Sequence, residues 1–191
     1  RAMPPTTTRT AVLLPAGHDV MDFGLEADFH GYSLRTGRYE WQDWTCREIA
    51  DARVVGDQGF VFLPDGRLLT PTLFPNHQLL HIFKVRRPIP LGARRVRGTV
   101  FHLTGSNHEN RGHFMLDHLP RLVAAQELLK RDPGARILLT GHHVRWQAEY
   151  LRLLGFDDAR IVPCHAGTVI AERLLHVPFA SYTLSVGPQF T

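Results

Sequence analysis

His113 and Asp117 stand four residues apart in the segment NRGHFMLDHLPRL, residues 110–122. On a helix, residues at i and i+4 share one face, so these two side chains would be neighbours. An imidazole has an ordinary pKa of about 6.5 and can accept a proton near neutral pH, while an adjacent carboxylate can orient the ring. We therefore expect His113 to be a general base, with Asp117 as a second base or as the group that orients it.

The same residues also have plainer interpretations, and these stay open. A histidine in the first turn of a helix often caps the helix or bonds to a nearby loop. Asp117 is spaced to form an ion pair with Arg121, the next i,i+4 position, and exposed pairs of this kind contribute little. Arg121 is accordingly either a substrate contact or an anchor for its helix.

The helix that carries these residues is expected to begin near Asn110 and to end near Lys130. The Asn110 side chain can accept a hydrogen bond from an amide of the first helical turn. Apolar residues then recur with helical spacing, at Phe114, Leu119, Leu122 and Val123. Pro120 lacks an amide hydrogen, so we expect it to kink the helix.

Strand and helix signals alternate from residue 99 onward. GTVFHLTG precedes the helix above, and RILLTG, a helix over about 144–154, ARIVPC and TVIAERLLHVP follow it. This alternation predicts an α/β fold with a Rossmann-like parallel sheet and crossover helices. Ligands of such sheets bind beyond the carboxyl ends of the strands. We expect substrate contacts mainly from the loops there, with the full set being Asn107, His108, Asn110, Arg121, Gly141 and His142.

Residues 1–98 are turn-rich and carry short strand signals. In GFVFLPDGRLLTP, a Pro-Asp-Gly turn separates two apolar runs, which predicts a β-hairpin. We therefore divide the chain into a β-rich N-terminal segment, residues 1–98, and an α/β layer, residues 99–191.

The composition limits the classes of protein that fit. With 191 residues, 43% of them hydrophobic, the chain can bury a globular core. No apolar run approaches the roughly 20 residues that span a bilayer, and the first ten residues lack the apolar core of a secretion signal. We expect a cytoplasmic protein without a transmembrane segment, and peripheral contact with a membrane stays open.

The formal charge of +4 is concentrated in KVRRPIPLGARRVRG, residues 84–98. This segment is either a solvated surface or a contact for a phosphorylated substrate or an anionic glycan. It has no interleaved aromatic residues and no nucleic-acid-binding motif accompanies it, so we expect no nucleic-acid partner.

A metal-dependent enzyme is the alternative suggested by twelve histidines. The residues with suitable ligand atoms are His108, His113, Asp117, His118, His142 and His143. On a helix, however, His118 is turned about 100° from Asp117, and no HExxH motif is present. We expect no metal and no other cofactor. His102 and His176 are predicted to be structural, and Cys46 and Cys164 to be buried free thiols.

Three segments carry a resemblance: VVGDQGFVFLPDGRLL, NRGHFMLDHLPRL and ILLTGHHVRWQAEYLRLLGFDDARIVP. Together they resemble the N-terminal half of the family 61 glycosyltransferases, many of which are capsular polysaccharide biosynthesis proteins. The resemblance covers roughly residues 50 to 178, and its most specific part is Asn-x-x-His followed by Leu-Pro-Arg-Leu. Arg111 and Gly112 stand where this family usually has aromatic residues.

The resemblance implies a GT-B-like architecture, in which two Rossmann-like halves enclose the active site. This chain would be the acceptor-side half, and a C-terminal half beyond residue 191 would bind the nucleotide-sugar donor. The implied reaction is the inverting transfer of a sugar from that donor to a hydroxyl of a glycan acceptor. The alternative is a non-catalytic glycan- or protein-binding module, in which the histidines only position loops.

Overall fold

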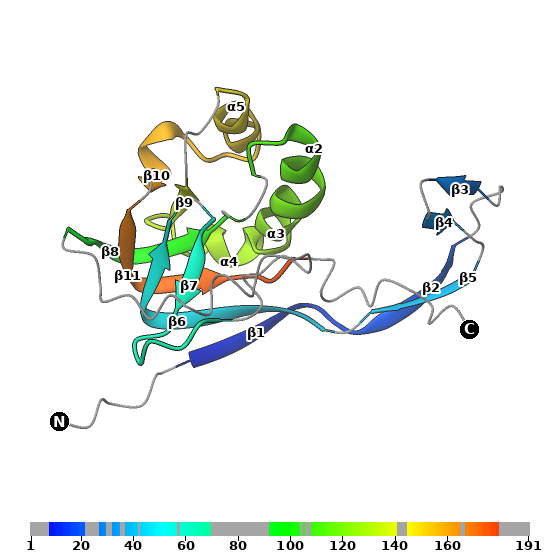
Figure 1. Ribbon diagram of the computed structural model, residues 1–191, viewed down its shortest axis with the longest axis horizontal. Coiled ribbons are helices and arrows are strands. Elements are labelled where there is room, and N and C mark those ends of the chain that lie inside the picture. The colour runs from blue at the N-terminus through cyan, green and yellow to red at the C-terminus, as the bar shows by residue number, and fades with distance from the viewer. Residues whose placement is uncertain are drawn as a thin grey trace.

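The structure is a computed structural model of the chain. It describes residues 8–21, 27–29, 32–34, 37–41, 43–56, 58–69, 92–103, 105, 108–140, 145–164 and 167–179. Within these ranges, the largest sheet has seven strands in the order β1-β6-β11-β8-β9-β10, and β7 pairs with β6 (Figure 1). The bounds are Thr8–Leu14 for β1, Trp44–Val55 for β6, Phe60–Phe62 for β7, Arg94–His102 for β8, Arg136–Thr140 for β9, Ile161–Cys164 for β10 and Thr168–His176 for β11.

The strands predicted after residue 99 are present and pair in parallel. β11 pairs with β8, β8 with β9, and β9 with β10, each in parallel register. The sheet as a whole is mixed, however, because β6 lies antiparallel to β11 on one side and to β1 on the other. The fold is therefore mixed α/β with a partly parallel sheet. The division drawn at residue 98 falls inside β8, and strands from both sides of it share this sheet.

The β-hairpin predicted before residue 70 is confirmed. Leu63 N–H donates to Arg67 O at 2.8 Å, Gly66 N–H donates to Leu63 O at 2.8 Å, and Phe62 and Leu68 form an antiparallel bridge. Gly66 has a φ of +87°, a conformation that favours glycine in a tight turn. Elsewhere, β2 (Gly17–Met21) pairs with β5 (Gly37–Trp41), and β3 (Ala27–Phe29) pairs with β4 (Tyr32–Leu34). Figure 1 shows that these pairs extend away from the large sheet.

The helical segment predicted over residues 110–130 is present, but it is not a uniform α-helix. It consists of α2 (Arg111–His113), a π-helical turn η2 (Phe114–His118), α3 (Leu119–Ala124) and α4 (Gln126–Lys130). The π turn ends just before Pro120, where Leu119 N–H bonds to Phe114 O, five residues back. An α-helix would require an amide hydrogen at Pro120 and would press its ring against a carbonyl. The wider turn relieves that conflict.

The second predicted helix is α5 (Arg145–Leu153), and a short 3-10 turn, η3 (Asp158–Arg160), precedes β10. α5 ends where expected, because Gly155 takes a φ of +85°. Phe156 N–H then donates to Leu151 O at 2.9 Å, which closes the helix end.

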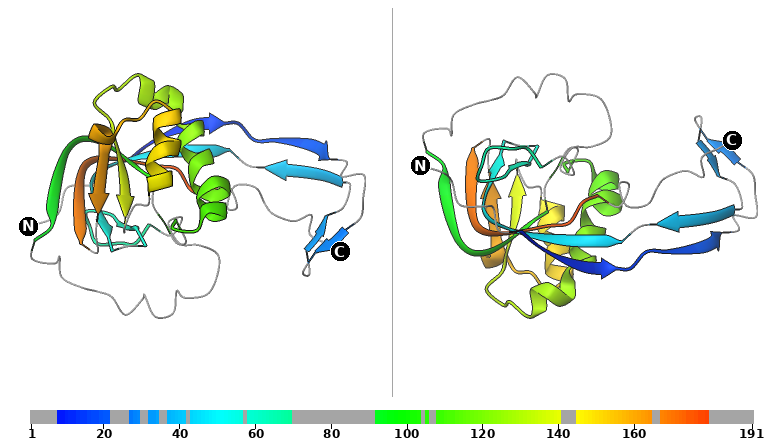
Figure 2. Two further views of the ribbon diagram at one scale, coloured as in Figure 1. Left: turned by 90° about the horizontal axis from the view of Figure 1, so that it is seen from above. Right: turned by 90° about the horizontal axis from the view of Figure 1, so that it is seen from below.

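The two faces of the sheet bury separate apolar clusters. The helices cover one face, where Phe114, Leu122 and Leu151 pack against Phe101 and Ile137. The hairpin of β7 covers the other face, where Val61 and Leu69 belong to a buried cluster with Val100, Leu138 and Leu174. Figure 2 shows the helices and the hairpin on opposite sides of the sheet. Burying each such side chain contributes roughly 1.5–3 kcal/mol, so the sheet is held from both faces.

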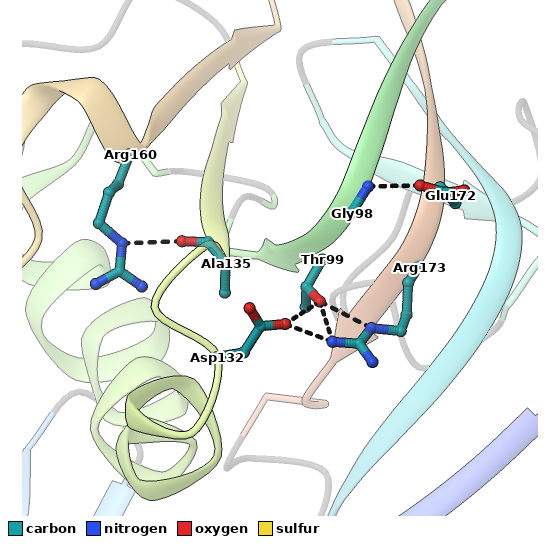
Figure 3. Close-up of polar contacts among 7 residues, drawn as sticks. All are labelled: Gly98, Thr99, Asp132, Ala135, Arg160, Glu172 and Arg173. Carbon is teal, nitrogen blue, oxygen red and sulfur yellow. Dashed lines mark hydrogen bonds and ion pairs between the residues drawn. The ribbon is translucent and has the colours of Figure 1, made fainter.

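Polar contacts connect the loop after α4 to β8 and β11 (Figure 3). The Thr99 hydroxyl donates to Asp132, and Arg173 contacts both residues, with its Nε 2.8 Å from Thr99 Oγ1. The Thr99 hydrogen bond and the Arg173 charge hold the pKa of Asp132 below its ordinary value. Gly98 N–H also donates to Glu172 Oε2 at 2.6 Å. Among the described residues, no helix is long and apolar enough to cross a membrane.

Candidate functional site

His113 and Asp117 are in contact, as their spacing predicts. His113 Nδ1 lies 2.7 Å from Asp117 Oδ2, and the two side chains are 40% and 20% exposed. The pair is therefore reachable from solvent while its carboxylate is mostly covered. The contact places Nδ1 against the carboxylate, so Nε2 is the ring nitrogen that does not face Asp117.

The start of the helix is built as the sequence predicts. The Asn110 side chain accepts a hydrogen bond from His113 N–H at 3.2 Å, which satisfies one of the amides of the first turn. This cap uses the Asn110 side chain to orient the turn that carries His113.

The π-helical turn η2 places its side chains in different environments. Phe114 and His118 are buried, whereas Leu116 is 74% exposed. Phe114 packs edge-on against Trp146 of α5, with ring centroids 5.1 Å apart. The buried side therefore fixes the turn between the sheet and α5, and Asp117 is held beside His113.

Arg111 and Tyr150 form a second polar contact at this end of the helix. Arg111 Nη2 donates to the Tyr150 hydroxyl at 2.9 Å, and its guanidinium lies 5.7 Å from the centre of the ring. Sequence reasoning singled out Arg111 only as a departure from the family pattern and missed Tyr150. The available signal was the pair of aromatic residues, Trp146 and Tyr150, four positions apart on the predicted helix.

Arg121 is completely buried and bridges the ends of two strands. Its Nε donates to Val177 O at 2.6 Å, and its Nη2 donates to His102 O at 2.8 Å. Its guanidinium also lies 4.6 Å from the centre of the Phe179 ring. Burial lowers the pKa of Arg121 to about 9, and the Cys46 and Asp117 side chains oppose that shift. The geometry matches the anchoring role that the sequence left open.

His108, a predicted substrate contact, and His118, considered above only as a metal ligand, are both buried. His108 is 3% exposed, and its Nδ1 lies 2.9 Å from Gly105 O, while Gln147 Nε2 donates to His108 O at 2.7 Å. His118 is fully buried, with Nδ1 3.0 Å from Leu103 O. These contacts tie His118 to Leu103, at the end of β8, and His108 to Gly105 and to α5.

His102 and His176 form a buried pair on the neighbouring strands β8 and β11. Their Nδ1 atoms are 3.1 Å apart, so one ring donates and the other accepts. Burial lowers the pKa of both rings well below the ordinary value, aided for His102 by the Arg121 charge and for His176 by the His102 ring. Both side chains are buried on strands, and their predicted structural role stays a prediction. Cys46 is a buried free thiol whose pKa burial raises to about 12.

Three predicted substrate contacts, Asn107, Gly141 and His142, lie outside the described residues. Their proximity to His113 stays a prediction. Within the part of the chain that the structure describes, no three histidine, cysteine, aspartate or glutamate side chains are grouped closely enough to hold a metal ion.

No family model, curated protein or solved structure matches this chain. The functional assignment therefore depends on the residues and contacts described above.

Proposed function

We propose that this chain is the acceptor-side half of an inverting glycosyltransferase that acts in the cytoplasm. It would move a sugar from a nucleotide-sugar donor to a hydroxyl of a glycan. The observation that carries the proposal is the 2.7 Å contact between His113 and Asp117 on a partly exposed helical turn. The resemblance of residues 110–122 to family 61 glycosyltransferases supports it. The parallel part of the sheet is compatible with a Rossmann-like half of a GT-B architecture.

In the proposed reaction, His113 accepts the proton of the acceptor hydroxyl at Nε2. The hydroxyl oxygen attacks the anomeric carbon of the donor, and the bond from that carbon to the nucleoside phosphate breaks. The leaving group departs with the electron pair, and one displacement inverts the configuration. Asp117 would stabilise the imidazolium that forms and would keep Nδ1 as the nitrogen facing the carboxylate.

The other residues of this region would act in two ways. Arg111 and Tyr150, whose side chains bond to each other beside the start of the helix, would contact the acceptor. Asn110, His108 and Arg121 would position the helix through their bonds to the backbone. Donor binding would require the second half of the architecture, so these 191 residues alone are expected to transfer no sugar.

The test is sugar transfer by the protein with both halves, compared for wild type, His113→Ala and Leu116→Ala. Loss of a general base should lower turnover by about 10²- to 10⁴-fold in His113→Ala. Leu116→Ala removes an exposed side chain of the same turn and should leave turnover unchanged. Nucleotide-sugar affinity should be nearly equal in all three. A transfer rate for His113→Ala within a few-fold of wild type would remove the catalytic role.

A protein-binding module is the second candidate, and one observation favours it. Met115, Leu116 and Val123 are 40%, 74% and 50% exposed on the helical segment that carries His113. Exposed apolar side chains on one segment are a feature of surfaces that contact another protein. A binding module would show no transfer, and Leu116→Asp would abolish its association with a partner while His113→Ala would not.

A further inference from the structure

A second concave surface has lining residues distinct from those around His113. We call it the basic groove. It has a volume of about 500 Å³ and lies between the first half of β8 and the strand β10. Four arginines line it: Arg94, Arg95, Arg97 and Arg136. Among the described residues that line it, none is acidic and none is aromatic. β8 is strongly curved (Figure 2), and three of these arginines belong to the part of the strand before Gly98.

Only part of this positive charge is compensated in the described structure. Arg95 forms an ion pair with Asp51 at 2.6 Å. Arg94 Nη2 donates to Pro163 O at 3.3 Å, and Arg136 Nη2 donates to the backbone oxygen of Arg97. Carbonyl oxygens satisfy a donor but carry no net charge. Among the described residues, Arg94, Arg97 and Arg136 therefore remain three positive charges without a carboxylate in ion-pair distance.

A nearby groove provides a direct contrast. It has a volume of about 410 Å³, and the residues that line it carry both signs of charge: Glu48, Asp132, Glu172 and Arg173. Figure 3 shows Arg173 against Asp132 and Glu172 against the Gly98 amide. There Arg173 forms an ion pair with Asp132, and Glu172 accepts a hydrogen bond from the Gly98 amide. The basic groove differs from it, because the charged residues that line it are all positive and like charges repel unless an anion lies among them.

We propose that the basic groove binds a phosphate-bearing anion through Arg94, Arg97 and Arg136. A guanidinium group has five N–H donors in a planar fork that matches phosphate oxygens, so one bond to a carbonyl still leaves donors for a ligand. The volume lies in the range of about 300–1,000 Å³ that is typical of small-molecule sites. This proposal does not depend on the glycosyltransferase assignment, because it uses none of the residues around His113.

The shape and composition of the groove select among anionic ligands. Single-stranded nucleic acids are usually held by aromatic side chains that stack on the bases, and the described lining has none. A concave site can also surround a single phosphate or diphosphate group on several sides, which a flat charged surface cannot do. The phosphate could belong to a soluble diphosphate or to a lipid headgroup, and both present the same oxygens to the guanidinium groups.

The test is calorimetric titration of the 191-residue chain with pyrophosphate at low ionic strength. Wild type should bind. Arg97→Glu should weaken binding by about tenfold or more, the usual range for loss of a charge-assisted hydrogen bond. The matched control is Arg145→Glu, which makes the same change of charge at a 92% exposed residue of α5 and should change affinity less than about twofold. Thermal unfolding of both variants checks that each remains folded.

The remaining outcomes are also decisive. No pyrophosphate binding by wild type, or equal weakening in both variants, would overturn the proposal. Vesicles of equal parts phosphatidylcholine and phosphatidylglycerol distinguish the two phosphate sources. If the protein binds the vesicles, and if both added pyrophosphate and the Arg97→Glu substitution reduce that binding, the site is assigned to lipid headgroups. If the protein does not bind the vesicles, the site is assigned to soluble phosphates. Single-stranded DNA binding that pyrophosphate does not displace would contradict the proposal.

Discussion

The Nδ1 atoms of His102 and His176 lie 3.1 Å apart, on adjacent parallel strands, and both rings are fully buried. Two histidines can share a hydrogen bond in this way only if at least one is neutral. Burial lowers the pKa of both rings, and the positive charge of the buried Arg121 guanidinium lowers it further. A proton added to either ring would therefore place a second positive charge beside Arg121 in the interior.

The first prediction is that the folded state loses stability as the pH falls below about 6.5. Both histidines have a lowered pKa in the folded state, so the unfolded chain binds protons there that the folded chain does not. Each group should then lower the free energy of unfolding by about 1.4 kcal/mol per pH unit, until the pH reaches its folded pKa. Urea unfolding followed between pH 8 and pH 5 measures the slope.

The double variant His102→Asn/His176→Asn is the comparison for that measurement. Asparagine keeps a polar atom close to the position of Nδ1 but does not titrate, so the slope between pH 6.5 and pH 5 should flatten. A slope equal to that of wild type would mean that other groups cause the acid sensitivity.

The second prediction concerns the buried cation. Arg121→Met should lower the free energy of unfolding by about 2–4 kcal/mol, because it leaves the carbonyls of Val177 and His102 without these donors in an apolar interior. The control is Arg145→Met, whose side chain is 92% exposed and should change stability by less than about 0.5 kcal/mol. Equal stability of Arg121→Met and wild type would contradict the anchoring role.

The third prediction is that Gly105→Ala destabilises the protein by about 1–3 kcal/mol. A Cβ at residue 105 would lie 2.5 Å from Phe179 Cζ and 3.1 Å from His118 Cε1, so these buried rings would have to move. Gly66→Ala provides an instructive comparison, because nothing lies within 4 Å of its added Cβ and only backbone strain would act. Chemical denaturation compares the two, and near-native stability of Gly105→Ala would show that the Phe179 ring can yield.

The fourth prediction separates the two members of the proposed site. Asp117→Asn should lower turnover of the complete protein by less than the 10²- to 10⁴-fold expected for His113→Ala, since an amide can still accept a hydrogen bond from Nδ1–H. The comparison requires full pH profiles of the transfer rate. A loss in Asp117→Asn that equals or exceeds the loss in His113→Ala would make Asp117 the better candidate for the base.

Local chemistry made the start of the helix predictable. The Asn110 cap and the i,i+4 pairing of His113 with Asp117 depend on neighbours within a few residues, and both were found as expected. The π-helical turn before Pro120 was not predicted. A proline indicates that one α-helical hydrogen bond must be lost. It does not indicate whether the helix will kink there or form a wider π-helical turn.

Contacts between strands that are distant in sequence could not be predicted from local sequence patterns. The antiparallel pairing of β6 with β11 joins segments more than a hundred residues apart, so alternation along the sequence suggested a purely parallel sheet. The His102–His176 contact depends on a one-residue register shift between β8 and β11, near Gly98, which has a φ of +73°. Such a shift changes which side chains share a face, and no repeat in the sequence signals it.

The buried thiol of Cys46 provides a way to observe the motions of this fold. Thiolates, not thiols, react with alkylating reagents, and a pKa of about 12 leaves roughly one thiolate in ten thousand at pH 8. Because the Cys46 side chain is also only 2% exposed, modification should proceed through molecules in which the packing of β6 against the helices has opened. In a Cys164→Ser variant, which retains a single cysteine, the alkylation rate would report how often that interior is exposed under native conditions.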